Sequence, residues 1–406
     1  LVCLDTDNNV LRPAILWNDQ RTQAQCDTIT AKLGAERLVQ LTGNRALTGF
    51  TAPKILWIRE HEPQVYAQIA HVLVAKDYIR FCLTGEYATD ANEACGMLLM
   101  DAGARQWSQE VLNALDIPEA WLPRVFEGPE LTGTVTAEAA ELTGLRVGTP
   151  VVAGGGDQAA QAVGVGAVAA GVIALTVGTS GVVFAPLGAY NYEPQGRLHA
   201  LCHSVPNMWH FMGVTLSAAG SLQWYRDTLA ANVPFDTLTA EAEAVPVGSD
   251  GLYFLPYLSG ERTPHPDPLA RGAFIGLTTR HTRGHLTRAV MEGVAYSLRD
   301  VFGLIQQSEA GKHITQVRVS GGGAKSALWR QIFADVLGVP LVTVTETEGA
   351  AYGAALLVGL SAGLWTNADE LAKVVSLGDE TQPSANTGLY ADKYALYQSL
   401  YPTLKP

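Results

Sequence analysis

Residues 151–160 read VVAGGGDQAA, in which a strand-like apolar run is followed by three glycines, an aspartate and the start of an alanine-rich, helix-like run. A strand that passes through glycines into a helix is typical of α/β proteins, where such turns bind phosphate groups or present a side chain to a substrate. Asp157 has two explanations that are compatible with each other. It is an N-cap of the following helix, or it is a general base whose charged form is favoured by the positive end of the helix dipole.

Two common nucleotide-binding patterns do not explain these glycines. Gly154, Gly156 and Ala159 satisfy the GxGxxA pattern of a dinucleotide-binding unit. However, the next strand runs into Gly178 and Thr179, where such a unit has an acidic residue for the ribose. The P-loop pattern GxxxxGK[ST] does not occur in the sequence. A nicotinamide-dependent enzyme and a P-loop NTPase are therefore excluded.

Two more glycine turns follow strand-like runs further along the chain. Residues 171–188, GVIALTVGTSGVVFAPLG, predict a β-hairpin whose tight turn consists of Gly178, Thr179, Ser180 and Gly181. The N–H groups and the two hydroxyls of this turn can surround phosphate oxygens, although a plain hairpin turn fits the sequence equally well. Gly321, Gly322 and Gly323 stand between a predicted strand and a predicted helix, a place that suits a nucleotide or an ordinary turn.

The rest of the chain alternates predicted strands and helices, which indicates an α/β protein. Helices are predicted over residues 22–40, 106–125 and 284–310. The 406 residues are too many for one hydrophobic core, and the pattern changes from mostly helical to strand-rich near residue 168. We therefore expect two domains, residues 1–168 and residues 169–406.

Composition narrows the possible partners. The formal net charge of −12 repels nucleic acids and anionic membrane surfaces, so neither is an expected partner. The five cysteines are scattered along the chain, which fits free thiols in a reducing cytoplasm better than a disulfide framework. The sequence contains no run of about 18 apolar residues, so no membrane span is expected. His199 and His203 lie in a strand-like segment without a third ligand, so no metal site made by protein side chains is expected.

Two longer segments carry a family resemblance. Residues 49–61, GFTAPKILWIREH, and residues 272–292, GAFIGLTTRHTRGHLTRAVME, match the two signatures of the FGGY carbohydrate kinases. The chain resembles this family over essentially its whole length. The resemblance implies two α/β domains of the actin/hexokinase/Hsp70 (ribonuclease H-like) type around a cleft, with ATP, Mg²⁺ and a small-molecule sugar as ligands. It places the sugar side in residues 1–168 and the nucleotide side in residues 169–406, and it implies a possible homodimer.

The resemblance also implies roles for individual residues. Asp157 matches the catalytic base of the family, and Gln158 follows it at a position that reaches the sugar, where some relatives have Asn. Both amides can donate to and accept from a hydroxyl. The turn from Gly178 to Gly181 matches the second phosphate-binding hairpin, and the turn from Gly321 to Gly323 matches the adenosine loop. Three polar residues after a strand are further candidates for contacts with substrate or Mg²⁺, although they also fit a plain polar strand exit: Asn18, Asp19 and Arg21.

Two family features do not occur in the sequence as given, namely a first strand with a DxGT-like turn and a Gln-Met-His-Gly stretch that grips the sugar. The N-terminal domain is therefore expected to lack its first strands here, and this segment alone is expected to be inactive. Residues 15–22, ILWNDQRT, and residues 255–265, LPYLSGERTPH, are most similar to family members that phosphorylate D-xylulose. We expect ATP-dependent formation of D-xylulose 5-phosphate in xylose catabolism. A kinase for another ketose or polyol (ribulose, L-xylulose or glycerol), an actin-like ATPase and a non-catalytic relic are the alternatives.

Overall fold

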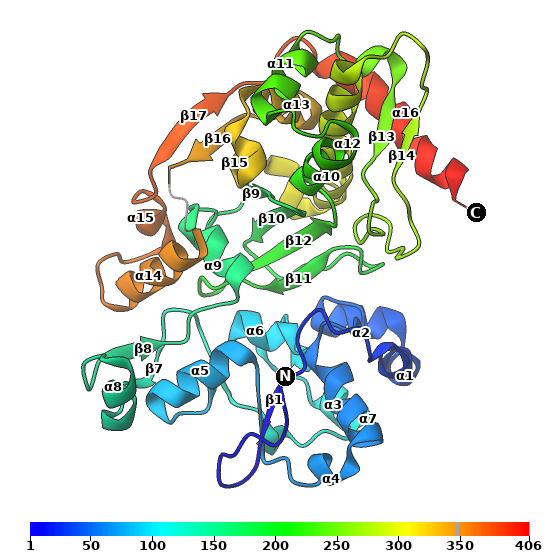
Figure 1. Ribbon diagram of the computed structural model, residues 1–406. Coiled ribbons are helices and arrows are strands. Elements are labelled where there is room, and N and C mark those ends of the chain that lie inside the picture. The colour runs from blue at the N-terminus through cyan, green and yellow to red at the C-terminus, as the bar shows by residue number, and fades with distance from the viewer. Residues whose placement is uncertain (346–348, 406) are drawn as a thin grey trace. The chain divides into compact units, whose positions relative to one another are not determined.

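Figure 1 shows the computed structural model of the chain, which describes residues 1–345 and 349–405. The chain forms two compact units, each made of segments that are distant in sequence. Unit 1 comprises Leu1–Val168, Leu187–His210 and Glu348–Val374. Unit 2 comprises Ala169–Pro186, Phe211–Thr347 and Val375–Pro406. The division into contiguous domains 1–168 and 169–406 stays a prediction.

Short strands and helices alternate in both units. Those of unit 1 are, in chain order, β1 (Val2–Leu4), α1 (Gln23–Leu33), α2 (Ala35–Thr42), α3 (Thr51–His61), α4 (Pro63–Tyr66), β2 (His71–Leu73), α5 (Ala75–Thr84), β3 (Ala88–Asp90), α6 (Ala91–Gly96), β4 (Met100–Asp101), β5 (Gln106–Trp107), α7 (Gln109–Leu115), β6 (Arg124–Phe126), β7 (Leu131–Thr134), α8 (Ala137–Thr143), β8 (Pro150–Val152), α9 (Asp157–Gly164), β11 (His199–Cys202), α14 (Gly349–Ser361) and α15 (Ala368–Ala372). Those of unit 2, which holds most of β12, are β9 (Val172–Val177), β10 (Gly181–Leu187), β12 (Trp209–Thr215), α10 (Ala219–Leu229), α11 (Phe235–Glu243), β13 (Tyr253–Leu255), β14 (Ala273–Ile275), α12 (Arg283–Gln306), β15 (Gln316–Ser320), α13 (Ala327–Leu337), β16 (Leu341–Val344), β17 (Leu377–Thr381) and α16 (Thr387–Leu404).

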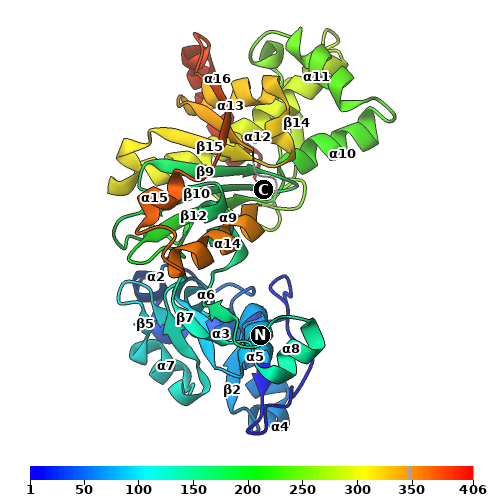
Figure 2. The same ribbon diagram turned by 90° about the vertical axis from the view of Figure 1, so that its left-hand side faces the viewer.

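A mixed sheet in unit 2 carries two of the glycine turns. Its strands that belong to unit 2 lie in the order β12-β10-β9-β15-β16-β17, and Figure 2 shows β9, β10 and β12 as successive strands. β9 and β10 are antiparallel, with Gly181 opposite Val177, so the hairpin predicted over residues 171–188 is confirmed. β15 runs parallel to β9, with Ser320 opposite Thr176. The C-terminal ends of the parallel strands β9 and β15 therefore lie next to each other, and the two glycine turns begin there.

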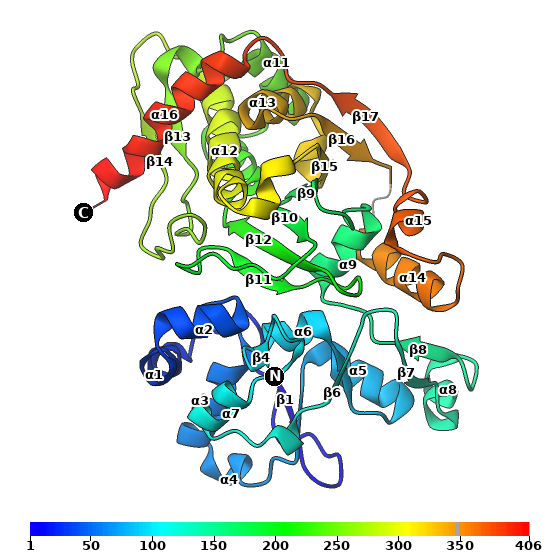
Figure 3. The same ribbon diagram turned by 180° about the vertical axis from the view of Figure 1, so that it is seen from behind.

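The long helix predicted over residues 284–310 is confirmed as α12, whose side chains are mostly buried. Figure 3 shows α12 and the C-terminal helix α16 from behind. The Tyr390 hydroxyl donates to Glu292 Oε1 (2.9 Å) and accepts from Arg288 Nη2 (2.9 Å). These bonds satisfy polar groups that burial would otherwise leave unpaired. The contact ties the C-terminal helix to the core of unit 2.

Unit 1 departs from the sequence predictions in two places. The helix predicted over residues 22–40 is two helices, α1 and α2, because Gly34 adopts a positive φ of 80° between them. The helix predicted over residues 106–125 was wrong for most of its length, since only α7 (Gln109–Leu115) is helical over four or more residues there. Asp116 takes a left-handed φ of 53° at its end, and prolines at 118 and 123 follow. Within the described residues, no helix is both long and apolar enough to cross a membrane.

Candidate active site

The loop of residues 153–156 is fixed at both ends by hydrogen bonds within unit 1. The Ala153 N–H donates to Glu130 O (2.9 Å), and Lys76 Nζ donates to Ala153 O (3.1 Å). At the other end, the Gly156 N–H donates to Asn92 Oδ1 (3.1 Å). Because a buried backbone group without a partner is costly, these bonds define one conformation for the loop. The loop in turn determines where α9 begins.

Asp157 is the first residue of α9, and Gly156 is its N-cap. The interpretation of Asp157 as the N-cap is therefore wrong by one residue, because the loop places a glycine at the non-helical boundary position. The Asp157 side chain is exposed, and it accepts from the backbone N–H of Gln158 (2.8 Å) and from Gln158 Nε2 (3.2 Å). The structure thus brings together the predicted base and its neighbour Gln158.

The glycines of this loop are required by close packing. A Cβ added to Gly155 would lie 1.9 Å from Ser204 Oγ, and one added to Gly156 would lie 2.6 Å from Asn92 Oδ1. Gly154 has a φ of 79°, in the left-handed region. The loop therefore lies against its neighbours at a distance that no residue with a side chain could reach without displacing them.

A cluster of charged side chains from α5 and β3 holds the loop of residues 153–156 through Lys76. Lys76 Nζ lies 2.8 Å from Asp77 Oδ1 and 2.8 Å from Asp90 Oδ2. Asp90 Oδ1 accepts the N–H groups of Asn92 and Glu93 and so caps α6. Burial alone lowers the pKa of the Lys76 ammonium, but Asp90 and then Asp77 raise it by more, so the pKa lies above its usual value. Lys76 therefore remains a charged anchor for the loop.

The predicted sugar contacts of residues 18–21 lie in an exposed turn. Arg21 Nη2 lies 2.7 Å from Asp19 Oδ2, and its guanidinium lies over the Trp57 ring, 4.8 Å from the ring centroid. Hydrogen bonds from Arg21 lower the pKa of the Asp19 carboxyl. Asn18 is exposed. Among the described residues, no hydrogen bond or ion pair joins this turn to Asp157 or Gln158, so a role for Asn18, Asp19 and Arg21 at the sugar stays a prediction.

In unit 2 the structure brings the other two glycine turns together. A Cβ on Gly321, which has a φ of 90°, would lie 2.7 Å from Val177 O, and one on Gly323 would lie 2.5 Å from Val177 Cγ1. The Thr176 and Ser320 hydroxyls are 3.3 Å apart. Val177 immediately precedes Gly178, so the turn 178–181 and the turn 321–323 lie side by side.

The turn 178–181 is also bound to the start of α10. The Ala218 N–H donates to Thr179 O (2.8 Å), and the Ala219 N–H donates to Gly178 O (2.8 Å). Gly220 is needed here, since a Cβ at this position would lie 2.7 Å from Thr179 O. The carbonyl oxygens of Gly178 and Thr179 therefore already accept hydrogen bonds from backbone N–H groups at the start of α10.

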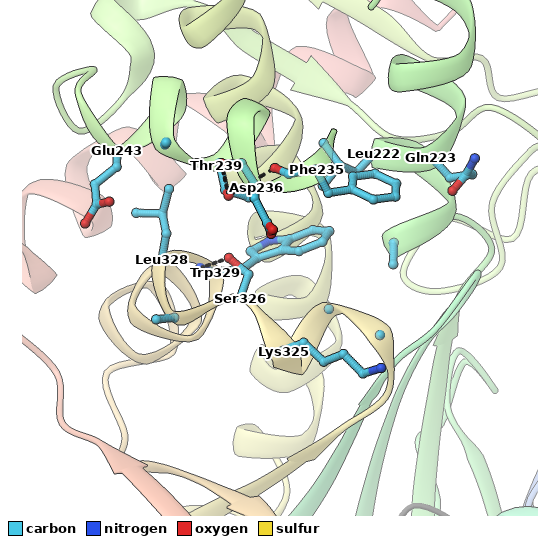
Figure 4. Close-up of a pocket in the computed structure, with 15 residues that line it drawn as sticks. Leu222, Gln223, Phe235, Asp236, Thr239, Glu243, Lys325, Ser326, Leu328 and Trp329 are labelled. Atoms are coloured by element: carbon cyan, nitrogen blue, oxygen red, sulfur yellow. Dashed lines mark hydrogen bonds between the residues drawn. The ribbon is translucent and has the colours of Figure 1, made fainter. Parts of the chain in front are cut away.

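A cavity of about 660 Å³ lies next to the turn 321–323. One wall is formed by Gly322 and Gly323 and the start of α13, and the other is formed by α10 and α11 (Figure 4). Its labelled side chains include Leu222, Gln223, Phe235, Asp236, Thr239, Glu243, Lys325, Ser326, Leu328 and Trp329. A largely apolar pocket with a few polar groups beside a glycine turn is typical of a small-ligand site. The wall from α10 and α11 could not be predicted from the sequence, because no local pattern indicates that helices so far before Gly322 in the chain contact it.

Family models now match both parts of the chain. The N-terminal domain of the FGGY family of carbohydrate kinases matches residues 1–164, and the C-terminal domain of the same family matches residues 173–362. The chain belongs to the FGGY family of carbohydrate kinases. The predicted resemblance is confirmed, and with it the α/β fold class of a two-domain FGGY kinase.

Relatives and solved structures similar to this FGGY kinase include several xylulose kinases. The curated xylulose kinase of Escherichia coli (strain K12) is 42% identical over 406 residues, which cover 99% of this chain and 82% of the relative. The crystal structure of xylulose kinase from Rhodospirillum rubrum has 33% sequence identity and a TM-score of 0.92, and the match covers 100% of this chain and 82% of that one. A gluconate kinase structure from Lactobacillus acidophilus is also similar, with 27% identity, a TM-score of 0.93, and 99% and 82% of the two chains covered.

Proposed function

We propose that this FGGY kinase transfers the γ-phosphoryl group of ATP to the 5-hydroxyl of D-xylulose. The observation that carries the proposal is the exposed carboxylate of Asp157, which a rigid loop presents at the N-terminus of α9. The similarity to curated xylulose kinases supports the choice of sugar. Asp157 and Gln158 lie on the sugar side, and the turns 178–181 and 321–323 lie on the nucleotide side.

The chemical step needs mainly positioning and charge stabilisation. Asp157 accepts the proton of the 5-hydroxyl while that oxygen attacks the γ-phosphorus. The bond between the γ-phosphorus and the β–γ bridging oxygen breaks, and ADP leaves. The N–H groups and hydroxyls of Thr179 and Ser180 in the turn 178–181 donate to phosphate oxygens. This assignment makes Asp157 the one group in the chain that must change its protonation state.

Mg²⁺ fits such a site without a dedicated set of protein ligands. The ion is usually held by substrate phosphates and water with one or two carboxylates at most. In the part of the chain that the structure describes, no three His, Cys, Asp or Glu side chains are grouped to hold a metal. When bound to ATP, Mg²⁺ neutralises charge on the phosphates. The turn 178–181 would then contact phosphate oxygens that the ion leaves free.

The cavity beside the turn 321–323 is the proposed adenosine site. Ala240 lines this cavity from α11, whereas Thr237 is exposed on the same helix and does not line it. Ala240→Trp should fill the pocket and raise the KM for ATP about tenfold or more, which corresponds to roughly 1.4 kcal/mol of lost binding. The KM for D-xylulose and the thermal unfolding midpoint should not change. Steady-state kinetics with ATP varied at saturating sugar would measure the effect.

Thr237→Trp is the matched control, because it adds the same side chain to the same helix outside the cavity. It should leave both KM values unchanged. An unchanged KM for ATP in Ala240→Trp would exclude this cavity as the adenosine site, while a raised KM in both variants would indicate a general effect on α11.

The sugar is tested separately from the site. A coupled assay of ADP release over D-xylulose, L-xylulose, ribulose, glycerol and gluconate, with the full-length protein, should give the highest kcat/KM for D-xylulose. Gluconate belongs in the panel because a gluconate kinase shares the fold. A higher kcat/KM for another acceptor would assign the enzyme to that acceptor, and release of ADP without any acceptor would favour an ATPase.

Two further parts of the proposal concern the protein as a whole. All five cysteines belong to the described chain and are free, with Cys82 alone exposed among them, which supports a reducing cytoplasm as the compartment. We also propose that residues 1–168 and 169–406 form the sugar-side and nucleotide-side domains. We expect a homodimer, and light scattering after size-exclusion chromatography would detect it.

A further inference from the structure

The carboxyl group of Glu93 lies directly beside the loop that carries the proposed base. Its backbone is fixed in the first turn of α6, where its N–H donates to Asp90 Oδ1 (3.1 Å). A Cβ added to Gly156 would lie 2.9 Å from Glu93 Oε1, so the loop passes close to this oxygen. Asp157 is the next residue along the chain. Glu93 Oε1 thus lies beside Gly156, the residue that precedes Asp157.

The neighbouring Asn92 shows what a purely structural side chain does at this place. Its Oδ1 accepts from Gly156 N (3.1 Å), and its Nδ2 donates to Cys202 O (2.7 Å). Glu93 is partly buried, yet its carboxyl oxygens make no hydrogen bond to any residue that the structure describes. Because these oxygens are only partly buried and have no partner among the described residues, they are open to a ligand.

Several charged groups face Glu93 from the elements around it. They are Asp77 and Lys76 on α5, Asp90 at the end of β3, Asp157 on α9 and the amino group of Leu1. Burial first, and then repulsion by Asp90, raise the pKa of Glu93 to about 8, while Lys76 counteracts the rise. Asp77 and Asp157 add to it. This rise extends the protonated form of Glu93, which can both donate and accept a hydrogen bond, toward neutral pH.

We propose that the Glu93 carboxyl group binds the 4-hydroxyl of the sugar, next to the 5-hydroxyl that Asp157 deprotonates. This inference rests on the proposed function. A hydroxyl can donate to the carboxyl group in either protonation state, and it can also accept from the carboxylic acid. A neutral Glu93 also avoids a second negative charge beside Asp157 and near the incoming phosphates. Glu93 thereby selects acceptors with a hydroxyl on the carbon next to the reacting one.

The test compares Glu93→Ala and Glu93→Gln in the full-length protein. Glu93→Ala should raise the KM for D-xylulose about tenfold or more, because the 4-hydroxyl loses its partner. Its KM for ATP and its thermal unfolding midpoint should stay unchanged. With the 4-deoxy analogue of the sugar, wild type and Glu93→Ala should have equal KM values. Equal losses with both sugars would show a structural role and overturn the proposal.

The pH dependence gives an independent readout. Glu93 is neutral below its pKa and ionises above it, so wild-type kcat/KM for the sugar should fall as the pH rises through about 8. Glu93→Gln cannot ionise and keeps a donor and an acceptor. It should retain most of the activity at about pH 7 and lose the alkaline fall. A fall of equal size in Glu93→Gln, or a large loss of activity in this variant at neutral pH, would overturn the neutral-acid assignment.

Glu86→Gln is the matched control. Glu86 is an exposed carboxylate just before β3 and packs against Gly133. Its replacement should leave the KM for sugar and the pH profile unchanged. Two outcomes distinguish the role of Glu93 from the proposed function. Phosphorylation of D-xylulose by wild type with no effect of Glu93→Ala refutes only the role of Glu93, whereas a wild-type protein that phosphorylates no sugar in the panel refutes the proposed function and this inference with it.

Discussion

Replacing Asp157 with Ala in the full-length protein should lower kcat for D-xylulose about a hundredfold to ten-thousandfold, the usual range for loss of a general base. The 5-hydroxyl is a weak nucleophile until its proton is accepted, and in this assignment Asp157 accepts it. The carboxylate is exposed and bonded only to Gln158 among the described residues, so its removal should leave the loop and the fold in place. ATP affinity should change little, because the proposed adenosine cavity is formed by residues of unit 2.

The measurement is steady-state kinetics together with the dissociation constant of ATP and the thermal unfolding midpoint. Asp369→Ala is the matched control, because Asp369 is also an exposed carboxylate in the first turn of a unit 1 helix, α15. Both variants lose a comparable interaction with a helix dipole, but only Asp157→Ala loses the base. A near-normal kcat in Asp157→Ala would leave Asp157 as an ordinary residue at a helix start.

The sequence predicts those parts of this site that depend only on residues close together in the chain. A strand, a glycine turn and a helix around Asp157 follow from periodicity and turn composition, and so does the hairpin of residues 171–188. The boundary error at Asp157 arose because aspartate is a favoured N-cap, and the hydrogen bond from Gly156 to Asn92 outweighs that preference. No residue near Asp157 in sequence indicates that Asn92 accepts the hydrogen bond from Gly156 and so holds the loop before Asp157 in place.

The parts that could not be predicted depend on contacts between distant segments. Lys76 reaches Ala153 across 77 positions, and no periodicity marks such a pair. Glu93 was missed for the same reason, since in sequence it is one more polar residue in a short helix. The cavity walls from α10 and α11 were missed because α12 and the strand β15 separate them from Gly322 along the chain. Local preference identifies turns and helices, whereas tertiary packing determines which turns share a site.

Replacing Gly353 with Ala should destabilise the protein by about 2 to 3 kcal/mol, as expected for overpacking against a backbone that cannot yield. Helices α9 and α14 contact each other through glycines. A Cβ on Gly353 would lie 1.7 Å from Ala160 O, and one on Gly164 would lie 1.9 Å from Gly349 O. One added methyl group therefore forces the two helices apart. Because α9 begins at Asp157, kcat should fall as well as stability.

Gly303→Ala is the control for this variant, since Gly303 lies in α12 and a Cβ there meets nothing within 4 Å. Alanine stabilises an open helix position by up to about 1 kcal/mol relative to glycine, so this variant should be as stable as wild type or more so. Urea unfolding of both variants measures the difference. The intrinsic helix preference is the same in the two cases, so opposite signs would isolate the contact between α9 and α14. Equal effects would mean that the two helices can separate at no cost, and the position of Asp157 would then not depend on α14.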